Sequence, residues 1–132
     1  MHHPAAAQMP TPEDGVSQPV PTAWRPILAA VVDRFAVGDF GLVQGVAGVV
    51  GVEPIPADLA DDIRAIVALT GERLAPLPPE AWERASAEWY TDRWIVLVDL
   101  WTTSGPSDLV MAGPMDETAD GLRFTVEIVH TP

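Results

Sequence analysis

The chain has 132 residues, with seven arginines and no lysine against nineteen acidic residues, which gives a formal net charge of −12. Affinity for nucleic acids depends on cations that displace counterions from phosphates, and anionic lipid surfaces repel a protein of this charge. The composition therefore argues against nucleic-acid and membrane partners. It leaves a basic protein as the partner that electrostatics would favour.

The chain contains no cysteine. This excludes disulfides, thiolate catalysis and cysteine-based zinc sites, and it agrees with a reducing cytoplasm. The glycine-rich stretch 41–52 lacks the Lys and Ser/Thr of a P-loop and the GxGxxG of a dinucleotide turn. The N-terminus has neither the basic start nor the apolar run of a secretory signal. We predict a cytoplasmic protein without a metal or a cofactor.

Residues 1–22 contain five prolines and few large apolar side chains. Such a segment buries too little surface to offset the entropy lost on ordering, so we predict a disordered tail. A single α+β domain is expected over residues 23–132. Its first helix is predicted at residues 24–37, with Pro26 in the first turn and an apolar stripe at helical spacing. The second is predicted at residues 57–70, with aspartates near its start.

The chain after Gly71 is typical of a β-rich segment. We expect a short extended piece at 73–77, a helical turn from Pro79, and strands at 85–90, 94–102, 108–112 and 122–130. A turn is predicted at residues 104–106, and an acidic connection ends at Asp120–Gly121. Strands joined by such short links predict an antiparallel meander of three to five strands beneath the two helices.

Alternation along the strands assigns their faces. Trp94, Val96, Val98 and Leu100 are expected to face the helices, which places Ile95, Leu97, Asp99 and Trp101 on the outer face. In the last strand the same rule turns the apolar set toward the helices, and this set consists of Leu122, Phe124, Val126, Ile128 and His130. An outer face that is largely apolar is expected to be covered by a loop, the tail, another subunit or a ligand.

Four residues are candidates for a binding site. Asp99 is a general base or hydrogen-bond anchor if its face is covered, whereas pairing with Arg93 or Arg123, or exposure to water, would make it structural. Trp101 is either a binding anchor or a cap on the outer layer of the sheet. Asp108 is expected to close the hairpin by bonding its backbone. His130 is expected to be a partly buried residue at the end of its strand.

Two resemblances add to these expectations. The run from Val32 to Phe40, the D-L-W-T of residues 99–102, the S-D-L of residues 107–109 and the terminal FTVEIVH resemble a family of small uncharacterised bacterial proteins. Val37-Gly38-Asp39-Phe40 is similar to a step in the nuclear-transport-factor-2-like group. The first resemblance implies an interaction or immunity-type module. The second implies a cone-shaped pocket with an acid/base pair.

We therefore predict a non-catalytic acidic protein-interaction module, immunity-like in type, that uses Asp99 and Trp101 on the outer face of the sheet. Its partner is expected to be a basic protein or a second copy of the chain. The alternative is a small-molecule binder or enzyme on a nuclear-transport-factor-2-like scaffold, with Asp99 or His130 in its pocket. A non-catalytic role is favoured because no catalytic constellation is evident.

Overall fold

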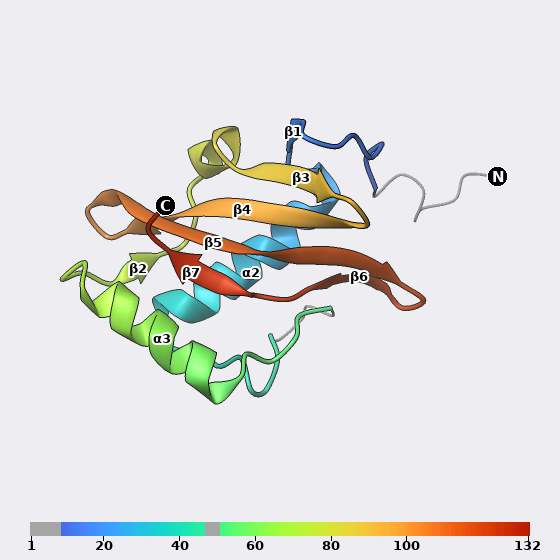
Figure 1. Ribbon diagram of the computed structural model, residues 1–132. Helices are drawn as coiled ribbons and strands as arrows, with labels where there is room; N and C mark the ends of the chain where they lie inside the picture. The colour runs from blue at the N-terminus through green and yellow to red at the C-terminus, as the bar shows by residue number, and fades with distance from the viewer. Residues whose placement is uncertain (1–8, 47–50) are drawn as a thin grey trace.

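Two α-helices pack against a seven-stranded antiparallel sheet in the computed structural model, which describes residues 9–46 and 51–132 (Figure 1). The helices are α2 (Arg25–Ala36) and α3 (Ala57–Ala68), and two 3-10 turns are η1 (Thr22–Trp24) and η2 (Pro79–Glu83). The strands are β1 (Ser17–Pro19), β2 (Leu74–Ala75), β3 (Ser86–Tyr90), β4 (Arg93–Thr102), β5 (Gly105–Thr118), β6 (Gly121–Phe124) and β7 (Ile128–His130). The α+β class is confirmed.

Both helices lie where the sequence predicts them. Pro26 stands in the first turn of α2, where its missing N–H costs no hydrogen bond. The helix buries one stripe, which consists of Leu28, Val31, Val32 and Phe35. Asp58 occupies the first turn of α3, where a carboxylate favours the helix dipole, and Ala60, Ile63 and Val67 are buried.

The sheet is larger than the predicted three to five strands. Its order is β1-β3-β4-β5-β6, with β2 added to β4 and β7 added to β5. Strands β3 to β6 follow one another in both sequence and space, as expected for a meander. Two strands exceed the prediction, because β1 pairs with β3 and the last predicted strand is divided into β6 and β7, whereas β2 falls within the extended piece expected at 73–77.

The predicted disordered tail is wrong for its last residues. Residues 1–8 of that segment, like residues 47–50 of the glycine-rich stretch, lie outside the described part of the chain. Farther along, β1 pairs with β3 in register from Ser17–Glu88 to Pro19–Ser86. Val20, which follows β1, is only 1% exposed. Pairing with β3 and burial of Val20 therefore order a segment whose composition alone favours disorder.

Strand β4 has the predicted faces. Trp94, Val96, Val98 and Leu100 are each at most 1% exposed and belong to the same core cluster as the buried residues of α2 and α3. The Trp94 indole makes edge-to-face contacts with Trp24 and Trp89, with ring centroids 6.1 and 5.4 Å apart. The helix-facing side of β4 is therefore filled with core side chains.

The predicted last strand contains a bulge that divides it into β6 and β7. Met115 of β5 pairs with Phe124, whereas Ala112 pairs with Ile128, so residues 125–127 face only two residues of β5. One extra residue on one strand shifts every later side chain to the opposite face. The bulge therefore reverses the faces of all residues in β7.

The prediction that Ile128 and His130 face the helices is wrong for this reason. Phe124 and Val126 are buried as expected, but beyond the bulge the buried residue is Val129, at 6% exposure, and Ile128 is 43% exposed. His130 pairs with Val110 and is partly buried. Both residues thus lie on the outer face of the sheet.

Candidate binding face

The outer face of the central strands carries a set of apolar side chains that Asp99 interrupts between Leu97 and Trp101, where the pairing of β4 with β5 is irregular. The register places them in rows, because Ile95 pairs with Pro114, Leu97 with Ala112, and Ala112 in turn with Ile128. We call this set the outer-face patch, and it comprises Ile95, Leu97, Trp101, Val110, Ala112, Pro114 and Ile128. None of the seven belongs to the core cluster or packs against it. The patch is therefore a second apolar layer, separated from the core by the sheet.

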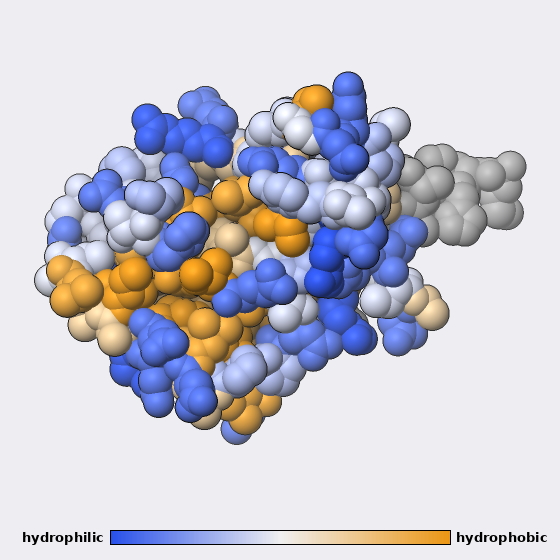
Figure 2. Space-filling model, in the orientation of Figure 1, coloured by the Kyte–Doolittle hydropathy of each residue, from blue (hydrophilic) through white to orange (hydrophobic). Residues whose placement is uncertain are grey.

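The patch is open at the surface of the molecule. Figure 2 shows the side of the sheet that faces away from α2, and apolar surface is gathered there over the middle of the sheet and toward α3. Ile128 is 43% exposed, and Ile95, Leu97 and Trp101 are partly exposed, whereas the three members on β5 are buried between them. Contiguous apolar surface of this kind on a soluble protein marks an interaction site more often than an isolated exposed side chain does.

Asp99 lies within this face, beside Trp101. Among the described residues its carboxylate makes no hydrogen bond and no ion pair, although it is partly buried. The two arginines considered as its partners are engaged elsewhere: Arg93 binds Asp116 at 2.9 Å and Arg123 binds Glu53 at 3.1 Å. The carboxylate is thus available to a group from outside the described chain.

A pocket of about 240 Å³ joins Asp99 and Trp101 to η2. Its remaining lining is Glu80, Ala81, Glu83, Arg84 and Pro106. Three carboxylates against one guanidinium, next to an indole, favour positively charged groups. The residues of η2 were not predicted as part of a site, because only folding brings this turn beside Trp101.

His130 shares the outer face with Asp99 but not its pocket. Both residues pair with Val110, which lies between them in one row of the sheet. The lining of the Asp99 pocket does not include His130. No group of three or more acidic, His or Cys side chains suited to a metal ion occurs in the described ranges. Neither Asp99 nor His130, the alternatives considered for an enzyme pocket, lies on the side of the sheet that the helices cover.

Asp108 does not close the hairpin, contrary to the prediction. Thr102 pairs with Gly105, so the turn is Thr103–Ser104, earlier than expected. The hydroxyl of Ser107 donates to the carbonyl of Leu100 at 2.7 Å and accepts from the amide of Leu109 at 3.1 Å.

Asp108 itself is exposed and makes no side-chain hydrogen bond within residues 9–46 and 51–132. It lines a different pocket, with Glu72 and Leu109. It therefore lies apart from the Asp99 pocket.

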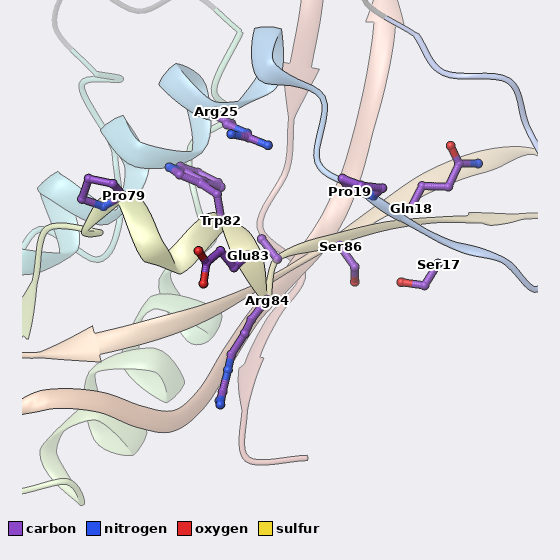
Figure 3. Close-up of a pocket in the computed structure, with 10 residues that line it drawn as sticks. Ser17, Gln18, Pro19, Arg25, Pro79, Trp82, Glu83, Arg84 and Ser86 are labelled. Atoms are coloured by element: carbon purple, nitrogen blue, oxygen red, sulfur yellow. The ribbon is translucent and has the colours of Figure 1, made fainter.

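A larger hollow of about 550 Å³ lies where β1 meets η2 and the start of β3 (Figure 3). The guanidinium of Arg25 lies 5.6 Å from the centre of the Trp82 ring, and its Nε donates to the carbonyl of Val20 at 3.2 Å. Figure 3 shows that the side chain of Arg84 extends away from Arg25. The hollow therefore does not focus its charged groups on one ligand position.

Titration of the Tyr90 hydroxyl tests its contact with Glu88 on the outer face of β3. Its hydroxyl donates to Glu88 at 2.7 Å, and this bond, followed by repulsion from the Glu88 charge and slight burial, raises the pKa of Tyr90 above its ordinary value. Since Tyr90 is the only tyrosine, its absorbance should titrate above about pH 10 in the folded protein. Glu88→Gln should lower the midpoint.

The sign of the linked effect on stability follows from the raised pKa of Tyr90. The stabilising contribution is complete below the unfolded pKa and is lost as the pH rises through the folded pKa. A Tyr90 midpoint that is the same in folded and denatured protein would contradict the Glu88 contact.

Comparison with known proteins gives one match. A family model described as a domain of unknown function (DUF7668) matches residues 32–132, and no curated protein and no solved structure matches the chain. The match agrees with the expectation of an uncharacterised family. It does not bear on the D-L-W-T and S-D-L signature or on the nuclear-transport-factor-2-like resemblance. Within the described residues no helix has the length and apolarity needed to cross a bilayer.

Proposed function

The chain belongs to the DUF7668 family, and we propose that it is a non-catalytic module that binds a basic protein through the outer-face patch. The observation that carries the proposal is the patch itself: seven apolar side chains outside the main core cluster, and beside them Asp99, whose carboxylate has no hydrogen bond or ion pair within residues 9–46 and 51–132. We also propose that the protein is cytoplasmic, because a chain without cysteine forms none of the disulfides that are typical of oxidising compartments.

Trp101 is the expected anchor of the interface. It is partly exposed, lies at one end of the patch and forms a wall of the Asp99 pocket. Tryptophan is enriched among interface residues whose truncation costs most, because a large rigid ring gains contact area at a small loss of conformational entropy. A basic side chain that entered the pocket would meet the indole and the carboxylates together.

The charge of the chain supports a basic partner. A net charge of −12 attracts a basic protein over long range and raises the rate of encounter, an effect that salt screens. An immunity-like role, in which this acidic surface covers and blocks a basic protein, is the finer form of the proposal. Its support is the charge and the resemblance to small acidic bacterial modules.

Trp101→Ala is expected to weaken binding of the partner by about 2 kcal/mol or more, since the substitution removes the anchor. The test compares the proteins that columns of wild-type and variant protein retain from the native cell, at low and high salt. The matched control is Val43→Ala, because Val43 is 78% exposed and outside the patch.

A partner of the proposed kind is retained by the wild type and by Val43→Ala at low salt, and is lost with Trp101→Ala. Its retention also falls as salt increases. A partner that is retained equally by the wild type and by Trp101→Ala, and equally at low and high salt, would contradict the proposal.

A further inference from the structure

The backbone edges of the sheet offer little room for an added strand. At one edge, β1 has three residues, and Pro19 among them lacks an N–H. At the other edge, residue Phe124 of β6 is bonded to the preceding loop: its amide donates to Gly51 at 2.7 Å and its carbonyl accepts from Glu53 at 3.1 Å. Strands β2 and β7 also pair with one neighbour only, but they contain just two and three residues. A partner is therefore more readily received on the face than on an edge.

The dimensions of the outer-face patch match one helix. Along β4 the patch runs from Ile95 to Trp101, roughly 20 Å at the usual rise of a strand. Across the sheet it covers β4, β5 and β7, three adjacent positions that span about 10 Å. An α-helix with its side chains is about 10–12 Å wide, and roughly 13 residues cover 20 Å. A second sheet would extend beyond the patch onto charged residues.

The charges beside the patch indicate the character of that helix. Glu88 pairs with Ile95 in the register, and Glu80 and Glu83 line the pocket next to Trp101. These carboxylates follow one long side of the patch, on the side of β3 and η2. Arg84 lines the same pocket as Glu80 and Glu83, and Arg93 near Glu88 is paired with Asp116. Basic side chains on one flank of a docked helix would meet them.

A second copy of the chain is a poorer occupant. Each copy carries a net charge of −12, and a symmetric dimer through this face would bring the same acidic side chains together. Like charges placed against each other in an interface disfavour association.

We infer that the partner docks an amphipathic basic helix along β4, with its apolar side on the outer-face patch and its basic flank toward Glu80, Glu83 and Glu88. The inference rests on the proposed function and specifies the partner segment. The partner segment must carry an apolar stripe at helical spacing with arginine or lysine beside it. Binding should therefore depend both on the order of the residues in the segment and on its charge.

Three synthetic peptides of about 18 residues test this inference by calorimetric titration. One has leucines at helical spacing flanked by arginine and lysine, one has the same residues in scrambled order, and one has glutamate in place of the basic residues. We expect the ordered basic peptide to bind and to gain helicity, and the other two to bind at least tenfold more weakly.

Two substitutions with equal charge locate the site. Ile128→Glu lies in the patch and should weaken the ordered basic peptide about tenfold or more, because it places a carboxylate under the apolar stripe. Val43→Glu adds the same charge outside the patch and should leave binding unchanged. Trp101→Ala, which adds no charge, should weaken binding as well, and its folding is checked by circular dichroism.

The peptide experiments test the docked helix independently of the proposed function. Equal binding of ordered and scrambled basic peptides would overturn the helix but leave the basic partner in place. Binding of the acidic peptide, equal effects of Ile128→Glu and Val43→Glu, or no binding of any peptide would overturn the inference. A monomer–dimer equilibrium of the free chain that Ile128→Glu abolishes would assign the patch to a second copy. The proposed function is judged separately, by the column experiment.

Discussion

Trp94→Ala should lower the free energy of unfolding by about 3–5 kcal/mol, a large share of the 5–15 kcal/mol typical of a domain. The indole is 1% exposed and contacts Trp24 and Trp89 edge to face. Truncation would remove these contacts and leave a cavity between the sheet and the helices that neighbouring rings cannot fill. Urea unfolding, followed by circular dichroism, measures the loss.

The matched control is Trp101→Ala, on the opposite face of the same strand. Trp101 is partly exposed and does not pack against the core cluster, so its truncation should cost less than about 1 kcal/mol. The two variants together separate stability from binding, because Trp94 supports the fold and Trp101 is proposed to anchor the partner. A larger loss for Trp101 than for Trp94 would reverse the assigned faces of β4.

The faces of β4 were predictable because the signal is local. Eight consecutive residues from Trp94 to Trp101 are apolar except Asp99, and the more exposed set includes that carboxylate. Alternation with a period of two then assigns the rest. The two helices were predictable for a similar reason, since proline at the start and an apolar stripe act within one element.

The missed strand and the missed pocket depend on partners far along the chain. β1 forms because β3 offers it a ladder, although nothing in the sequence around Ser17 favours a strand. The pocket beside Trp101 needs η2 placed against the end of β4. Trp101 and Asp99 could be selected from the sequence as candidate site residues. The glutamates and Arg84 that complete their pocket could not, because no sequence pattern relates residues 80–84 to residues 99–101.

The bulge between β6 and β7 is the unpredicted feature that changes the surface most. It moves Ile128 and His130 from the expected helix-facing side to the outer face, and so supplies the most exposed aliphatic member of the patch. An alternation rule applied to residues 122–130 assumes an unbroken ladder. Here the bulge lies against β5 at Gly113, where the carbonyl of Thr125 occupies the space that a side chain would fill.

Gly113→Ala should destabilise the protein by about 1–3 kcal/mol or more, because the bulge packs onto the bare backbone of this glycine. A Cβ at position 113 would overlap the carbonyl oxygen of Thr125 and lie 2.9 Å from its carbonyl carbon. These are backbone atoms, held by bonds from the amide of Thr125 to Pro114 and from the amide of Glu127 to Ala112. Relief therefore requires β5 and the bulge to separate.

The control for Gly113→Ala is Gly71→Ala, which isolates backbone strain from overlap. Gly71 has a φ of +72° after α3, and a Cβ there would meet nothing within 4 Å, so only the left-handed conformation is penalised, by about 1–2 kcal/mol.

Thermal unfolding ranks the stability of the two variants, and amide hydrogen exchange reports which part of each variant opens. In Gly113→Ala the amides of Thr125 and Glu127 should lose protection first, whereas in Gly71→Ala they should keep it. Retained protection at both amides in a Gly113→Ala variant as stable as the wild type would show that the bulge does not depend on this close approach. The exposure of Ile128 would then need a different cause.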